Sequence, residues 1–236
     1  MLNIPVKMKM KYLFGFLLIS LMLAACNKKN TVGVGQFMFV NAGPELGSVD
    51  ILFDGTKFNT SALPYGESTG YQSLIQRAHV MKVTSAGSST SLYDASLSTA
   101  ADIKQSFYIY DRLASLKVFA VEDLFNAPSG GKANIRFFHL CAGAPLIDVG
   151  TISGTVFTPV FTSRTFENSS SAFTSATFTE ITAGTYTFEI RVTGAGTPLL
   201  TVNNIQLQDG KSYSLFAKGI SGNVTTPLLM GVVENK

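Results

Sequence analysis

Cys141 and His139 are the residues of this sequence best suited to nucleophilic chemistry. A cysteine thiol becomes a strong nucleophile when a histidine accepts its proton, and these two residues stand two positions apart, so on one strand they face the same side. A small, buried cysteine is the commoner role of a lone thiol. The other histidine, His79, has no Cys, Asp or Glu at the spacing of metal ligands. We therefore expect no catalytic residue, no metal and no cofactor, and an enzyme that uses Cys141 and His139 is the least favoured alternative.

Asp50 and Asp148 occupy matching places in the two halves of the chain. Calcium sites need several oxygen ligands in one loop, and neither aspartate lies in an Asp-rich loop. A hydrogen bond at a turn or a strand end is the favoured role. The runs 88–91 and 169–171, rich in Ser and Thr, lack a Gly-x-Ser-x-Gly elbow and are interpreted as loops.

Aromatic side chains are the remaining candidates for a binding site, because exposed rings stack on sugars or anchor a protein partner. Tyr65, Tyr71 and Tyr93 fall near predicted loops or strand ends. Most of the 18 Phe residues must belong to the core, and the chain contains no Trp, which weakens the case for a glycan ligand.

The first 25 residues have the order of a secretory signal peptide. Three lysines, at positions 7, 9 and 11, precede an apolar stretch over 12–25, which is shorter than the roughly 20 residues of a membrane-spanning helix. Leu23, Ala24, Ala25 and Cys26 resemble the bacterial lipobox, in which the cysteine is lipidated before cleavage. Each buried lipid methylene contributes about 0.8 kcal/mol, so acyl chains on Cys26 anchor the protein to a membrane without spanning it.

Removal of this leader changes the charge balance. The whole chain has 18 Lys and Arg against 15 Asp and Glu, and without the three leader lysines the numbers are equal. Nucleic-acid binding needs a clustered basic face, which a neutral mature chain of this kind does not offer. Of the two cysteines, lipid occupies Cys26, so Cys141 has no intramolecular disulfide partner.

Short β-strands dominate the pattern that follows. Residues 26–35 are polar and contain glycine, which is typical of a flexible tether. Beyond them, runs of β-formers such as 37–40, 49–53, 185–192 and 213–216 recur at intervals of roughly 8 to 12 residues, separated by Gly, Pro and Asn. The Asp-Gly pairs at 54–55 and 209–210 predict chain reversals. Only residues 100–107 suggest a short helical turn, so the sequence predicts an all-β fold.

An internal repeat divides the chain. At an offset of 98, residues 37–41 match 135–139 and residues 49–51 match 147–149. Residues 83–87 also match 192–196, and 104–110 match 210–216, with offsets that drift through loop insertions. A Pro-Ser-Gly-Gly stretch lies between the copies. The predicted organisation is a signal peptide (1–25), a tether (26–35), a β-sandwich domain (36–121), a linker (122–132) and a second β-sandwich domain (133–236).

Each copy also resembles the bacterial domain of unknown function 4397, which occurs in lipoproteins of Bacteroidetes and other bacteria. The first copy matches through residues 41–44, 49–51, 54–55 and the Pro-Tyr-Gly at 64–66, and the second through Pro145 and residues 147–149, 183–186 and 210–213. The second copy has residues 166–168, Phe-Glu-Asn, in place of Tyr-Gly. The resemblance implies tandem immunoglobulin-like or transthyretin-like sandwiches and no agreed activity.

These patterns together predict a non-catalytic lipoprotein of the cell envelope that binds a protein or glycan partner, or acts as a scaffold. A structural subunit or accessory of a surface fibre is the alternative. The residues after Cys26 favour the outer membrane, because Asn27, and not an Asp that retains lipoproteins at the inner membrane in some bacteria, follows it. The membrane face stays open.

Overall fold

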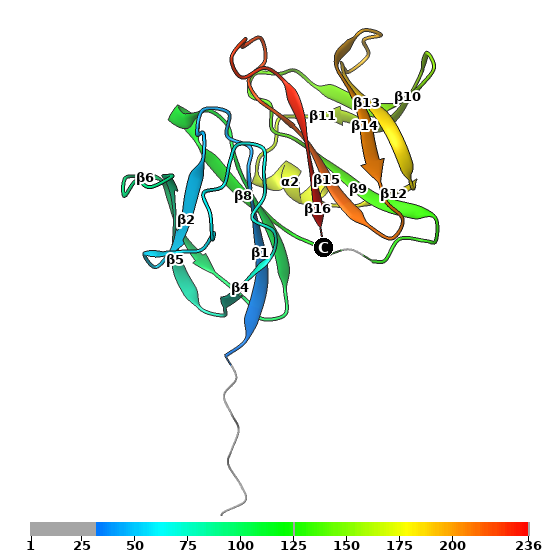
Figure 1. Cartoon of the computed structure of the whole chain (residues 1–236). Coiled ribbons are helices and arrows are strands. Elements are labelled where there is room, and N and C mark those ends of the chain that lie inside the picture. Colours follow the sequence, from blue (N-terminus) through cyan, green and yellow to red (C-terminus); the bar gives the residue numbers. More distant parts are fainter. Residues whose placement is uncertain (1–31, 125, 236) are drawn as a thin grey trace, which may run out of the picture. The chain divides into compact units, whose positions relative to one another are not determined.

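Short runs of β-branched and aromatic residues, separated by turns that often contain glycine, form the strands of this protein (Figure 1). The computed structural model describes residues 32–124 and 126–235. The predicted signal peptide, Cys26 and most of the tether therefore lie outside the described residues. Residues from Gly33 onward form one compact unit.

The elements divide evenly between the two halves of the sequence. The first half contains β1 (Val34–Asn41), β2 (Val49–Phe53), β3 (Thr56–Lys57), β4 (Gln72–Ile75), β5 (Ala78–Ser85), β6 (Ser91–Ser98), β7 (Lys104–Tyr110), the 3-10 turn η1 (Leu113–Ser115) and β8 (Lys117–Glu122). The second half contains β9 (Lys132–His139), β10 (Ile147–Ser153), β11 (Val156–Arg164), α2 (Ser169–Ser175), β12 (Thr179–Thr182), β13 (Gly184–Val192), β14 (Pro198–Leu207), β15 (Ser212–Lys218) and β16 (Leu229–Asn235).

Both halves have the same topology. In the first, the sheets have the orders β4-β1-β7-β8 and β3-β2-β5-β6, and in the second β12-β9-β15-β16 and β11-β10-β13-β14. The central pairs β1–β7 and β9–β15 are parallel, while the other pairs in each sheet are antiparallel. The prediction of an all-β sandwich fold is therefore confirmed.

The continuous apolar runs reflect sheets that are buried on both faces. In β1, Phe37 and Phe39 pack against β2 and β5 in the core of the first sandwich. Met38 and Val40 point to the other face, where they join a third core that contains Phe138 and other residues of the second half. The two sandwiches thus share a hydrophobic core through the outer faces of their β1- and β9-containing sheets.

The strand registers show which positions of the two halves correspond. Met38 pairs with Ser106, and Arg136 pairs with Ser214, so an alignment of β1 with β9 at the offset of 98 makes Ser106 correspond to Ser214. The predicted match of 104–110 to 210–216 is two residues out of register, because Ser106 corresponds to Ser214. A two-residue slip keeps every side chain on the same face, so the sequence pattern alone does not resolve it.

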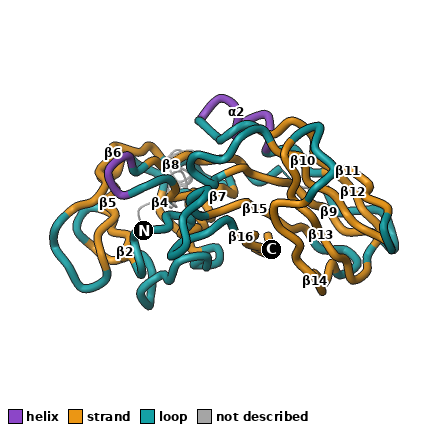
Figure 2. The backbone as a smooth tube through the Cα atoms, turned by 90° about the horizontal axis from the view of Figure 1, so that it is seen from above, coloured by secondary structure: helices purple, strands orange, loops and turns teal. Residues whose placement is uncertain are grey.

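Three local expectations need correction. Val34 and Gly35, assigned to the tether, pair with Ile75 and Leu74 as part of β1. Residues 104–107, in the expected helical turn, lie in β7. The run 169–171, interpreted as a loop, begins α2, which is the α-helix of the described chain (Figure 2). Asn168 caps this helix by accepting from the backbone N–H groups of Ser170 and Ser171, and the short run gave no helical period.

Candidate functional site

His139 and Cys141 contact each other through the backbone and not through the thiol. The backbone N–H of Cys141 donates to Nδ1 of His139 (3.4 Å), so Nε2 carries the proton and donates to the carbonyl of Pro145 (3.1 Å). Both ring nitrogens are therefore engaged by main-chain groups. Cys141 is fully buried, and desolvation raises the pKa of its thiol to about 11.

Asn41, at the corresponding position of the first half, makes the same two bonds. Its side-chain amide donates to the carbonyl of Gly47 (2.8 Å) and its oxygen accepts from the N–H of Gly43 (3.3 Å). With the offset of 98, these partners correspond to Pro145 and Cys141. His139 therefore serves as a turn-stabilising residue in place of an asparagine, which explains its burial without any catalytic role.

The other predicted polar residues also take part in local structure. Asp50 pairs with Lys57 (2.6 Å) and accepts from the N–H of Gly87, and Asp148 accepts from the N–H of Ser163. The expectation of turn and strand-end hydrogen bonds is confirmed for both aspartates. His79 lies between Asp54 and the carbonyl of Ile75. Among residues 32–124 and 126–235, no group of three His, Cys, Asp or Glu side chains is placed to hold a metal ion.

The three candidate tyrosines are all partly buried. The Tyr65 ring lies under the ammonium of Lys218 (4.4 Å), and burial raises the pKa of its hydroxyl to about 12. Tyr93 packs against the core of the first sandwich. The hydroxyl of Tyr71 donates to Asp123 (2.6 Å). None of these rings is the exposed platform that the sequence suggested.

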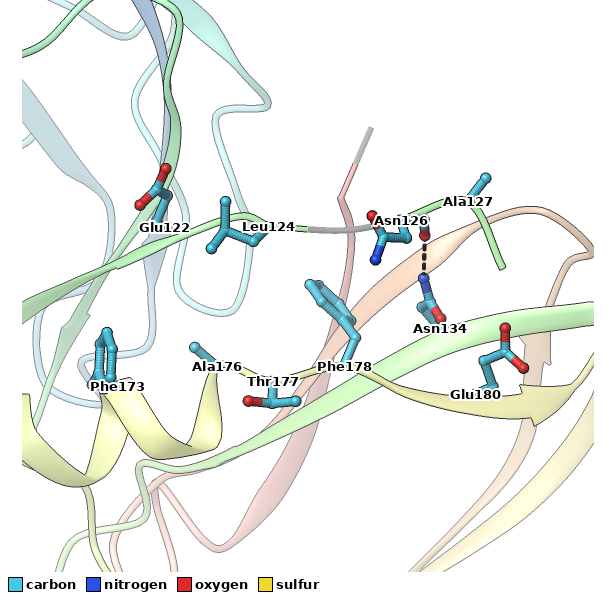
Figure 3. A pocket seen from close by; sticks show the side chains of 10 residues that line it. All are labelled: Glu122, Leu124, Asn126, Ala127, Asn134, Phe173, Ala176, Thr177, Phe178 and Glu180. Atoms are coloured by element: carbon cyan, nitrogen blue, oxygen red, sulfur yellow. Dashed lines mark hydrogen bonds between the residues drawn. The ribbon is translucent and has the colours of Figure 1, made fainter. Parts of the chain in front are cut away.

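An open groove instead lies between two segments that are distant in sequence (Figure 3). One wall comes from Glu122, Leu124, Asn126 and Ala127, at the end of β8 and the start of the predicted linker. The other comes from α2, the turn after it and β12. Its volume is about 480 Å³. We call this the linker groove; it is lined by Glu122, Leu124, Asn126, Ala127, Asn134, Phe173, Ala176, Thr177, Phe178 and Glu180.

Two apolar side chains in this groove are strongly exposed. Phe173 is 81% exposed and Leu124 is 76% exposed, although the chain has ample core in which to bury such residues. The helix explains the position of Phe173, because the neighbouring Ala172 faces the shared core and Phe173 projects outward. Exposed apolar side chains gathered at a concave surface are typical of a binding site.

A buried ion pair fixes both walls of the linker groove. Nη2 of Arg136 donates to Oδ1 of Asp123 (2.5 Å), and both side chains are fully shielded from solvent. Asp123 lies between Glu122 and Leu124 on one wall. The guanidinium of Arg136 stacks on the ring of Phe178 (4.5 Å) on the other wall. The linker is held further along by Asn134, whose side-chain amide donates to the carbonyl of Asn126 (2.8 Å).

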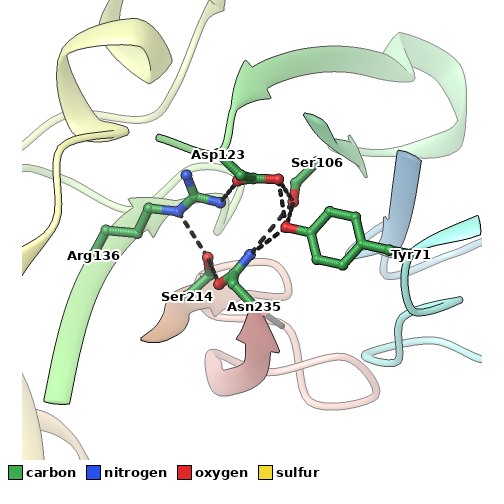
Figure 4. A network of polar contacts seen from close by, with 6 residues as sticks. All are labelled: Tyr71, Ser106, Asp123, Arg136, Ser214 and Asn235. Atoms are coloured by element: carbon green, nitrogen blue, oxygen red, sulfur yellow. Dashed lines mark hydrogen bonds and ion pairs between the residues drawn. The ribbon is translucent and has the colours of Figure 1, made fainter. Parts of the chain in front are cut away.

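A hydrogen-bond network from both halves surrounds this ion pair (Figure 4). Oδ2 of Asp123 accepts from Tyr71 and from Ser106 (2.6 Å each). Nε of Arg136 donates to Ser214 (2.8 Å), whose hydroxyl donates to Asn235 (2.7 Å). The network therefore satisfies both oxygens of Asp123 and joins the halves, as a buried charge requires.

Sequence reasoning missed Leu124, which lies in the predicted linker, and Phe173, which follows the run 169–171 interpreted as a loop. The available signal was a large apolar residue inside a polar stretch, Phe173 within the Ser- and Thr-rich run 169–175. Only the fold brings that run close to the linker.

One family of known domains is similar to part of this chain. Residues 35–150 match the family model of DUF4397, a domain of unknown function. The match extends from β1 into β10 and supports a resemblance to this family. No curated protein matches the chain.

One of the solved structures that match this chain is similar over most of its length. It is CBMbc (family CBM26) from Eubacterium rectale Amy13K in complex with maltoheptaose, with 11% sequence identity and a TM-score of 0.25. The similarity covers 86% of this chain and 97% of that chain. A TM-score this low does not support a functional conclusion.

Proposed function

We propose that this chain is a lipid-anchored, non-catalytic binding module of the bacterial cell envelope, and that it holds its partner in the linker groove. The observation that carries the proposal is the exposure of Phe173 and Leu124 at a concave surface. Large apolar side chains at the centre of an interface supply most of its binding energy.

The rigidity of the groove supports the same role. Asp123 and Arg136 hold the two walls through a shielded ion pair, so little conformational freedom is lost when a partner binds. Preorganisation of this kind raises affinity without adding contacts.

Membrane anchoring is the part of the proposal that comes from the sequence. The lipobox over Leu23–Cys26 would place acyl chains on Cys26, with the outer membrane as the favoured location. Among the described residues, no helix has the length and apolar character needed to cross a membrane.

An enzyme that uses Cys141 and His139 is a weaker proposal. A catalytic thiol needs access to substrate and a base directed at its proton. Cys141 is buried, and the nitrogens of His139 are bonded to backbone groups.

Cross-linking in intact cells followed by affinity capture tests the binding proposal. The tagged full chain should capture a specific envelope component, and Phe173→Ala should reduce that capture without loss of protein. Val224→Ala is the matched control, because Val224 is 96% exposed and does not line the groove. Equal capture by Phe173→Ala and wild type would refute the groove as the binding site.

Fractionation tests the anchor separately. Cys26→Ala should move the protein from the membrane to the soluble fraction, and incorporation of labelled fatty acid should be lost. Retention of both membrane association and label in this variant would exclude Cys26 as the lipid attachment site.

A further inference from the structure

We infer that the linker groove takes an extended polypeptide segment in which a Lys or Arg side chain stands next to a large apolar one. This inference rests on the proposed function and specifies its ligand. It follows from the charge of the groove, from the chemistry of its rings and from occupied sites of the same composition elsewhere in the chain.

The charge of the groove is negative. Its charged lining residues are Glu122 and Glu180, and none of the described lining residues is basic. Glu180 already binds Lys132 (2.8 Å) and Ser129, which hold the pKa of its carboxyl down at about 2. Glu122 pairs through its backbone with Gln105 in the β7–β8 ladder, and it is exposed to solvent. It therefore offers an available carboxylate at the end of the groove where Phe173 projects (Figure 3).

The rings of the groove complement a cation. The π face of phenylalanine attracts ammonium and guanidinium groups within about 6 Å. Lys and Arg also carry apolar stems that cover a ring while the charged end reaches a carboxylate. Phe173 supplies the ring of such a site, and Glu122 supplies the carboxylate.

The chain fills equivalent arrangements with its own arginines. Arg191 lies over the ring of Phe157 (4.1 Å) and donates to Glu189 (2.6 Å). Beneath the linker groove, Arg136 likewise stacks on Phe178 and pairs with Asp123. Phe173 and Glu122 offer an aromatic ring and a carboxylate of the same kind, and the ring is 81% exposed.

A polypeptide fits this composition better than a glycan. Anionic envelope polysaccharides would be repelled by the carboxylate of Glu122, whereas that of Glu180 is paired with Lys132. A neutral oligosaccharide needs many free hydrogen-bonding groups. Of the polar side chains that line the groove, Glu180 and Asn134 already bond within the chain, and Leu124, Phe173 and Ala176 contribute apolar surface. A peptide segment supplies the apolar contact and the cation together, and a volume of about 480 Å³ accommodates a few side chains.

Fluorescence anisotropy with defined probes tests this inference. The full chain, purified in a nonionic detergent, is titrated into a short labelled peptide that alternates arginine and leucine, and into a counterpart with glutamine in place of arginine. We expect the arginine peptide to bind more tightly, with affinity that falls as salt concentration rises.

Three variants separate the contributions. Glu122→Gln should weaken binding of the arginine peptide by roughly two- to fivefold at low salt and leave the glutamine peptide unaffected. Phe173→Ala should weaken both peptides, the arginine peptide by roughly fivefold or more. Asp94→Asn, a carboxylate change on β6 outside the groove, should change neither.

Several results would overturn the inference. Absence of arginine-peptide binding, equal affinity for the two peptides, or no effect of Glu122→Gln would each do so. Binding of neutral oligosaccharides that Phe173→Ala abolishes would also overturn it, while leaving the proposed function intact. Failure of the proposed function would appear differently, as cellular capture that Phe173→Ala does not reduce.

Discussion

Arg136 and Asp123 form an ion pair that joins the two halves of the chain with both side chains fully shielded from solvent. In the repeat, the position that corresponds to each of these two residues holds an uncharged residue. Met38 corresponds to Arg136, and the registers of β8 and β16 place Asn235 at the position of Asp123. The internal repeat thus supplies an uncharged residue for each member of the pair.

Replacing either charged residue alone should be costly. Asp123→Asn leaves a buried guanidinium without its counterion, and Arg136→Met leaves a buried carboxylate, so each should lower the free energy of unfolding by about 3–5 kcal/mol. The double variant should be more stable than either single variant, because it removes both charges. Urea unfolding of the four proteins measures this coupling, and additive losses would contradict it.

The stability should depend on pH through His139. Burial is the main cause of a lowered pKa for this ring, so the folded protein resists its protonation. Its contribution to stability is therefore complete above the unfolded pKa of 6.5 and is lost as the pH falls below that value. His139→Asn, which copies Asn41, should remove this loss, worth at most about 1.4 kcal/mol per pH unit. Denaturant titrations between pH 7 and pH 5 provide the measurement. If the free energy of unfolding depends on pH equally in the wild type and in His139→Asn, His139 is not the source of the pH dependence.

Gly66, in the Tyr65-Gly66 pair of the first half, should tolerate substitution poorly. Gly66 has φ = +89°, and a Cβ there would clash with Nζ of Lys218. Gly66→Ala should therefore displace Lys218 from the Tyr65 ring in addition to straining the backbone. Gly70→Ala isolates the backbone cost of about 1–2 kcal/mol, because Gly70 has φ = +66° and no atom near its Cβ position. Thermal unfolding should show the larger loss for Gly66→Ala, and equal losses would exclude a contribution from Lys218.

The N-terminal cap of α2 should influence the linker groove. Asn168→Ala removes the side-chain oxygen that accepts from two backbone N–H groups, at a cost of about 1 kcal/mol. Loss of order in the helix should then weaken binding at Phe173. Asn168→Ser, which retains a capping oxygen, should bind normally. Partner capture and thermal unfolding of the two variants distinguish these outcomes. Equal capture by both variants would show that partner binding does not depend on the order of α2.

The sequence predicted strands well where a run of β-formers ended at a turn residue. The run 49–53 is β2, and Asp54 and Gly55 have the positive φ angles of a tight reversal. The repeat at offset 98 aligns β1 with β9 so that Asn41 and His139 make equivalent turn hydrogen bonds. It aligned 104–110 with the wrong residues of β15, because a slip by two residues preserves the alternation of faces.

The linker groove could not be predicted from local pattern. Leu124 and Phe173 are 49 positions apart in the sequence, and their proximity depends on the shared core and on the Arg136–Asp123 pair. Tyr71 illustrates the converse problem. Its position near a strand end suggested an exposed ring, but long-range bonds to Asp123 and Asn235 hold its hydroxyl inside.

The last described strand has a consequence for the order of folding. Asn235 donates to Tyr71, a residue 164 positions earlier, and Val233 belongs to the core that both halves share. Because β16 completes this contact, the outer face of the first sandwich stays uncovered until β16 has been synthesised. During that interval Met38, Val40 and Tyr108 form an apolar surface prone to aggregation. Deletion of β16 should therefore reduce the yield of folded protein far more than the length of this strand suggests.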